Sequence, residues 1–172
     1  MQTSDPPLLL TPVQTAEEIQ VVADLAENVW TEHYTPLIGA AQVAYMIEKF
    51  QSVPAITEQI RQGYRYYLMQ YDGISAGYTA ILSEPAEKSL FLSKIYVEKA
   101  YRGKHITSQT IAALKKICRA EGLEKIWLTV NKGNHSSIAV YEHLGFVKVR
   151  DVVTDIGEGY VMDDHIMEAT IS

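Results

Sequence analysis

A short basic segment at a predicted strand-to-helix junction is suited to bind a phosphate group. Alternating apolar residues over 89–97 predict a strand, and the amphipathic pattern over 104–121 predicts a helix. Arg102 and Lys104 lie at the junction, and Ser108 follows in the first helical turn. A helix N-terminus presents unpaired backbone N–H groups and about half a positive charge. The junction therefore predicts a phosphate or pyrophosphate site, to which both cations and the hydroxyl would contribute.

An ordinary surface helix with a basic first turn is an equally simple interpretation of the same residues. The segment is not a Walker loop, because no Gly-Lys-Ser/Thr follows a glycine at the required spacing. It is not a Rossmann fingerprint either. Taken alone, the junction leaves both interpretations open.

A second segment, residues 134–146, places a tyrosine on a short helix before a glycine. Ile138 and Tyr141 are three residues apart and share a helix face, and Gly145 ends the helix. A lone tyrosine at such a position is most often a core aromatic residue. A tyrosine hydroxyl beside a reacting group also serves as a general acid, but this pattern by itself favours the core role.

The elements that must position these segments follow from hydrophobic periodicity and from turn residues. Thr15 and Glu18 form a capping box, and Asp72-Gly73 is a hairpin signal. The predicted helices cover residues 16–30, 36–50, 54–63, 104–121 and 136–144. The predicted strands cover residues 8–13, 64–71, 74–82, 89–97, 125–130, 146–151 and 160–171. This order predicts an α/β or α+β domain, with a mixed sheet flanked by helices on both faces.

Length and composition indicate one globular domain over residues 1–172. The chain is 47% hydrophobic and 21% charged, and its net charge is −6. No run of Lys and Arg stands out, which argues against nucleic-acid binding. The acidic balance suits a cationic substrate, and it equally suits an ordinary soluble protein.

Cysteine usage and the N-terminal residues predict a cytoplasmic location. Cys118 is the single cysteine, so no internal disulfide forms, and its place on the 104–121 helix predicts a buried, inert thiol. Residues 1–7 lack the pattern of a signal peptide, and no stretch reaches the ~18–20 apolar residues that span a bilayer. No metal site is expected, because metal-ligand spacing is absent among His33, His105, His135, His143 and His165.

Taken together, the two segments resemble the central motifs of the GCN5-related N-acetyltransferase (GNAT) superfamily. The family's loop, Arg/Gln-x-x-Gly-x-Gly/Ala, aligns with residues 102–107, where His105 and Thr107 replace the two glycines. The family's later motif, Asn-x-x-Ala-x-x-x-Tyr-x-x-x-Gly-Phe, aligns with Asn134, Ser137, Tyr141, Gly145 and Phe146. The stretch 156–167 is similar, more weakly, to the end of bacterial polyamine acetyltransferases.

The resemblance implies a GNAT-like fold with a mostly antiparallel sheet, and transfer of acetyl from acetyl-CoA to a primary amine of a small molecule. It implies that Tyr141 is the general acid and that a backbone N–H near Val97 stabilises the oxyanion. It allows for a homodimer, and it implies no nucleic-acid or membrane partner. The implied acetyl-CoA contacts are Ile95, Tyr96, Val97, Arg102, Gly103, Lys104, His105, Ile106, Thr107, Ser108, Asn134 and Tyr141.

The departures from the motif concern the loop and the general base. His is among the non-glycine residues that adopt positive φ, so His105 is expected to keep the turn, whereas Thr107 is bulkier than the family's residue. Ser93 and Lys94 occupy the neighbourhood where many relatives carry a glutamate. The base is left open among Glu32, His33, Tyr34, Asp163 and Asp164. A non-catalytic acyl-CoA-binding or regulatory domain is the alternative function.

Overall fold

The computed structural model describes residues 6–171, so residues 1–5 of the N-terminal segment and Ser172 lie outside it. Its elements alternate as the sequence predicts, with two added 3-10 turns at Pro85–Glu87 and Lys99–Tyr101. In chain order they are β1 (Leu8–Pro12), α1 (Ala16–Ile38), α2 (Ala40–Phe50), α3 (Val53–Arg61), β2 (Arg65–Tyr71), β3 (Ile74–Glu84), β4 (Ser89–Val97), α4 (Ile106–Glu121), β5 (Lys125–Asn131), α5 (His135–His143), β6 (Val147–Gly157) and β7 (Tyr160–Thr170).

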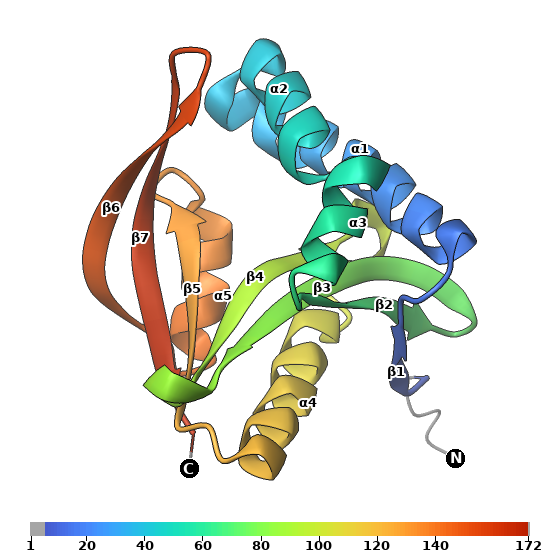
Figure 1. Ribbon diagram of the computed structural model, residues 1–172, viewed down its shortest axis with the longest axis vertical. Helices are drawn as coiled ribbons and strands as arrows, with labels where there is room; N and C mark the ends of the chain where they lie inside the picture. The colour runs from blue at the N-terminus through green and yellow to red at the C-terminus, as the bar shows by residue number, and fades with distance from the viewer. Residues whose placement is uncertain (1–5, 172) are drawn as a thin grey trace. The chain divides into compact units, whose positions relative to one another are not determined.

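The strands form a mostly antiparallel seven-stranded sheet in the order β1-β2-β3-β4-β5-β7-β6, which confirms the predicted fold class. β4 and β5 run parallel (Figure 1). The chain divides into two compact units, Met1–Ile81 with Lys94–Ala113, and Leu82–Ser93 with Leu114–Ser172. They are called the first and the second unit below, and each is described by itself.

The first unit contains the helices α1, α2 and α3, which pack against one another, and the start of α4. Its strands are β1, β2, β3 and the end of β4. β1 and β2 are antiparallel, and so are β2 and β3, which are joined by the predicted turn with φ of 52° at Asp72 and 76° at Gly73. Such values are those of the tight turns that join antiparallel strands. The predicted capping box begins α1: the Thr15 side chain accepts from the Glu18 N–H, and the Glu18 side chain accepts from the Thr15 N–H.

Gly77 is a glycine because β3 approaches β4 closely at this point. A Cβ on Gly77 would lie 2.2 Å from the Tyr96 carbonyl oxygen and 3.0 Å from the Val97 Cα. Any side chain at position 77 would therefore clash with the backbone of β4, just before the basic junction. Met69, Ala76, Val97 and Ile106 pack together here, so the last residue of β4 and the first residue of α4 share one apolar core.

In the second unit, β5, β7 and β6 are joined by antiparallel pairing. Along β5 the residues Ile126, Leu128 and Val130 are buried and alternate with half-buried residues, as the period of two predicts. α5 follows β5, and its C-terminal end is marked by Gly145 at φ 95°. Phe146 next to it is 1% exposed.

Three predicted element limits were wrong. The first helix continues from Trp30 to Ile38 and contains Pro36, and the second begins at Ala40 instead of residue 36. Pro36 lies in the last turn of α1 and removes one N–H donor there, yet the helix continues to Ile38 and the break falls at Gly39 with φ 88°. The strand predicted over 146–151 continues to Gly157, since its long pairing with β7 outweighs weak local signals.

Candidate active site

The junction between β4 and α4 presents a row of available backbone donors in the first unit. None of the backbone N–H groups from Gly103 to Ser108 donates to an acceptor among the described residues. Gly103 has φ 82° and His105 has φ 61°, which confirms that His105 keeps the positive φ of the family's glycine. The first helical hydrogen bond, from Gln109 N–H to the His105 carbonyl, is formed at 3.0 Å. Six successive donors at a helix N-terminus suit a phosphate or pyrophosphate.

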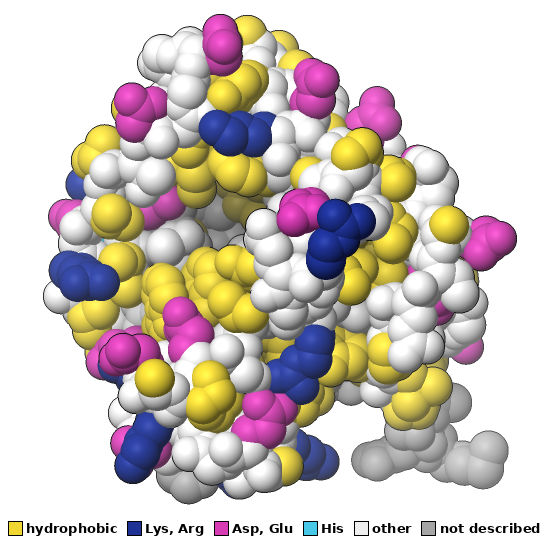
Figure 2. Space-filling view, in the orientation of Figure 1, with side chains coloured by type: hydrophobic (Ala, Val, Ile, Leu, Met, Phe, Trp, Pro, Cys, Tyr) yellow, Lys and Arg dark blue, Asp and Glu magenta, His cyan; other side chains and the backbone are white. Residues whose placement is uncertain are grey.

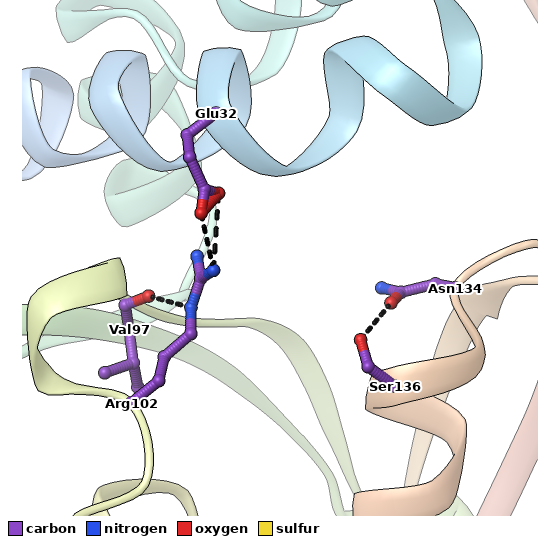
Figure 3. A network of polar contacts seen from close by, with 5 residues as sticks. All are labelled: Glu32, Val97, Arg102, Asn134 and Ser136. Carbon is purple, nitrogen blue, oxygen red and sulfur yellow. Dashed lines mark hydrogen bonds and ion pairs between the residues drawn. The ribbon is translucent and has the colours of Figure 1, made fainter.

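Arg102 is held beside this row by two contacts (Figure 3). Its Nε donates to the Val97 carbonyl oxygen at 3.0 Å, and its Nη1 donates to the Glu32 carboxylate at 2.7 Å. Both side chains of the ion pair are about one third exposed. The guanidinium is thereby fixed to the end of β4, and part of its charge is compensated by Glu32.

The other predicted junction residues differ in what their side chains do. The Ser108 hydroxyl donates to the His105 carbonyl at 3.0 Å, so it closes the first turn. Thr107 is half-buried and helical, and therefore needs none of the conformational freedom of the glycine that it replaces. Lys104 is exposed, whereas Ile106 is 2% exposed and belongs to the core.

The end of β4 has one core face and one aromatic face. Val97 is buried, and Ile95 packs against the same core. On the other face, the Tyr96 ring lies 5.4 Å from that of Tyr78 and 5.6 Å from that of Trp30. These core and ring contacts hold the end of β4 in place.

Asn134 and Tyr141 lie in the second unit, Asn134 as the N-cap of α5 and Tyr141 on the helix itself. Asn134 caps the helix: its Oδ1 accepts from the Ser137 N–H and from the Ser136 hydroxyl, both at 3.4 Å, and Figure 3 shows the latter contact. Tyr141 is 9% exposed, and its ring centroid lies 5.8 Å from that of Phe146. Asn134 thus caps α5 and the Tyr141 ring packs against Phe146, and the general-acid role of Tyr141 stays a prediction.

The residues considered for the general base have different environments. Glu32 pairs with Arg102, and Tyr34 stacks on Trp30 with 4.3 Å between ring centroids, with His33 edge-on to it. Asp163 is exposed and pairs with Lys132 at 2.8 Å. Asp164 is 4% exposed, and burial, with the neighbouring Asp163 charge, raises the pKa of its carboxyl to about 6.

The buried environment of the Lys94 side chain was not predicted from the sequence. It is 6% exposed, and its Nζ donates to the Phe50 carbonyl, to Gln59 Oε1 at 3.0 Å and to the Tyr66 hydroxyl. Burial lowers its pKa to about 7. The sequence offered one signal of this burial, a lysine at an inward-facing position of a strand with alternating apolar residues.

Metal-binding clusters and membrane-spanning helices were sought in the part of the chain that the structure describes. Within residues 6–171 no group of three or more His, Cys, Asp or Glu side chains is arranged to hold a metal ion. Over the same range no helix is both long and apolar enough to cross a bilayer. Figure 2 shows Lys and Arg side chains interspersed with Asp and Glu over the face that it presents.

Comparison with known proteins decides the family. Residues 24–146 match the model of the acetyltransferase (GNAT) family, a range that contains both the junction and α5. The chain belongs to the acetyltransferase (GNAT) family. Members of this family use acetyl-CoA as co-substrate. An uncharacterized N-acetyltransferase of Escherichia coli K12, YjgM, is 29% identical over 86 residues, which span 49% of this chain and 52% of that protein.

Solved structures share the fold at low sequence identity. The PaiA N-acetyltransferase of Thermoplasma acidophilum, in complex with coenzyme A, has a TM-score of 0.78 at 16% identity over 95% of this chain and 99% of that one. The spermidine N-acetyltransferase of Vibrio cholerae, in complex with CoA and spermine, has a TM-score of 0.70 at 17% identity, covering 95% of both chains. These likenesses establish the fold.

Proposed function

We propose that this protein transfers an acetyl group from acetyl-CoA to a primary amine of a small molecule. The observation that supports the proposal best is the row of six available N–H donors at the β4–α4 junction, in a chain of an acetyltransferase family. The predicted cytoplasmic location would supply both acetyl-CoA and small amines.

The junction residues fit the pyrophosphate of the co-substrate. The N–H groups of Gly103 to Ser108 would bind its oxygens, with Arg102 and Lys104 adding charge. The backbone of Ile95 to Val97 would hold the remainder near the acetyl group. When bound, acetyl-CoA supplies an activated thioester.

Proton transfers are the chemistry that the protein's own residues must provide. An alkylamine with a pKa near ~10.4 is about 1 part in 2,500 neutral at pH 7, and only the neutral form attacks. This fraction corresponds to a penalty of roughly 4.6 kcal/mol, which a base or a water relay must offset. The departing thiolate needs a proton, and we assign its donation to the Tyr141 hydroxyl.

The acceptor that we propose is a small cationic amine, with polyamines as the leading class. The support is the net charge of −6, the similarity of residues 156–167 to polyamine acetyltransferases, and the fold shared with spermidine N-acetyltransferases. A non-catalytic acyl-CoA-binding domain is the second candidate. It is favoured by the absence of both loop glycines.

Replacement of Tyr141 by phenylalanine tests the catalytic proposal. Tyr141→Phe should lower kcat by roughly 10²–10⁴ and change acetyl-CoA affinity little, because it removes a single hydroxyl, the proton donor, and keeps the ring. Release of free thiol measures turnover with a panel of amines, and calorimetry measures affinity. Tyr67→Phe, at a half-buried position of β2, is the matched control. Wild-type turnover in Tyr141→Phe would make Tyr141 a core residue only, and acetyl-CoA binding without turnover of any amine would favour the second candidate.

A further inference from the structure

β6, in the second unit, is a long strand at the edge of the sheet. It spans Val147–Gly157 and pairs with β7 on one side (Figure 1), and within residues 6–171 no strand pairs with its other side. That outer side presents backbone N–H and C=O groups to which a further strand can add. At the opposite end of the sheet, β1 is five residues long and ends at Pro12, two features that protect an edge.

The side chains of β6 are exposed along most of the strand. Ile156 is its one buried residue, whereas Val147, Val149 and Val153 are 59%, 44% and 64% exposed. A single exposed valine is ordinary, but a long edge strand with several is a surface that monomeric proteins avoid. The outer side of β6 is therefore a candidate interaction surface.

The pairing with β7 determines which side chains of β6 share a face. Alternate residues of β7, namely Val161, Asp163, His165 and Met167, point to one face of the sheet. Their partners on β6 are Asp155, Val153, Asp151 and Lys148, because Val149 is the extra residue of a bulge. The other face of β6 carries Thr154, Val152, Arg150 and Val147.

The charges of β6 are arranged with positive side chains first and a carboxylate at the far end. Lys148 and Arg150 form no ion pair with any residue that the structure describes, and over the same range Asp155 accepts a hydrogen bond from the Gly157 N–H but has no cation. Asp151, between them, already contacts Lys132 and His165. A strand with this polarity is complementary to itself when the second strand runs in the opposite direction, and repels itself when the two run in parallel.

We propose that β6 pairs antiparallel with β6 of a second copy of this chain, so that the two sheets join edge to edge. A two-fold axis at Val152 places Val152 opposite its own counterpart, and the bulge at Val149 then places Lys148 opposite Asp155 of the second copy. By symmetry this ion pair forms twice. Arg150 faces Thr154 of the second copy, so no like charges are opposed.

Neighbouring registers of the same pairing are disfavoured by charge. An axis at Asp151 opposes two aspartates, and an axis at Arg150 opposes two arginines. An axis at Val153 opposes Asp151 to Asp155 twice. The register centred on Val152 is therefore the one that the side chains of β6 specify.

Sedimentation equilibrium of the full chain tests this interface. The wild type should sediment as a dimer, at twice the 19.3 kDa of one chain. Lys148→Glu and Asp155→Lys should each raise the dimer Kd by about tenfold or more, because each turns two attractive cross-strand pairs into two repulsive ones. Lys116→Glu makes the same change in net charge at an exposed position of α4, so it is the control and should leave the dimer Kd unchanged.

Mixing the two variants separates this pairing from a general loss of stability. An equimolar mixture of Lys148→Glu and Asp155→Lys should form the dimer again, because each cross-strand pair then joins a cation to a carboxylate, and the double variant should dimerise by itself for the same reason. Recovery also shows that both variants are folded. A wild type that stays monomeric at about 0.1 mM would overturn the proposal. So would a dimer that neither single variant weakens, which would place the interface elsewhere, or a mixture that does not recover.

Discussion

Replacing Lys94 by methionine should change how the stability of the protein depends on pH. The Lys94 ammonium is 6% exposed and is held by three oxygens, from Phe50, Gln59 and Tyr66, of which none belongs to a carboxylate. Its charge is therefore removed from water without a counter-ion. Methionine has a similar length and no charge, so Lys94→Met removes this buried charge together with the three hydrogen bonds.

The magnitude follows from the difference between the folded and unfolded pKa of Lys94. Burial lowers the pKa from 10.5 to about 7, so between these values the unfolded chain binds more protons than the folded one. Stability then rises with pH, and the change between pH 7 and pH 9 is about 2 kcal/mol. The three oxygen acceptors favour the charged lysine, so this figure is an upper bound.

Urea unfolding of wild type and Lys94→Met at pH 7 and pH 9 measures the effect. The wild type should gain up to about 2 kcal/mol relative to the variant over this range, and the exposed Lys116→Met should show no such change. Measurements stop at pH 9 because burial raises the pKa of Tyr66 and of Tyr78, and these groups reverse the trend once unfolded tyrosines ionise. A difference between wild type and Lys94→Met that does not vary with pH would refute the reasoning.

Two further predictions concern the phosphate-binding junction. Glu32→Gln should tighten acetyl-CoA binding by up to about fivefold, since an ion pair that is one third exposed contributes about 0.2–1 kcal/mol and its loss frees Arg102. Glu58→Gln, which breaks the more exposed ion pair with Arg61, is the control and should leave acetyl-CoA binding unchanged. Calorimetry measures the affinities, and weaker binding in Glu32→Gln would contradict the prediction. Thr107→Ala should leave the affinity for acetyl-CoA equal or tighter, because threonine is bulkier than the glycine or alanine of the family's loop. Strongly weakened binding would show instead that the Thr107 hydroxyl contacts the ligand.

The local features of the fold could be predicted because short-range sequence determines them. The capping box of α1, the Asp72-Gly73 turn and the limits of β4 follow from residues within a few positions of one another. The positive φ of His105 was predictable too, because histidine is one of the few residues that tolerate it. The motif of α5 was recognisable for the same reason, since its cap and its aromatic pair lie on one short segment.

Contacts between distant residues could not be predicted from the sequence. The ion pair of Glu32 with Arg102 joins positions 70 apart, and the Lys94 contact with Phe50 joins positions 44 apart. Asp163 and Asp164 are equivalent in the sequence, and only the pairing of β7 with its neighbours decides which of them faces Lys132. The sequence alone therefore could not distinguish these two aspartates as candidates for the general base.

Lys94 and Asp164 are two buried ionisable groups that differ in their hydrogen bonds. Both are less than 7% exposed, and burial shifts the pKa of each toward neutrality. Perturbed groups of this kind are candidates for function, but structural groups are perturbed as well. Lys94 has three acceptors for its three protons, so its hydrogen bonds are complete and it ties β4 to α2, α3 and β2. Asp164 has no hydrogen-bond donor within the described residues, but its oxygens are not among the buried side-chain atoms that lack a partner, so contact with water supports its charge.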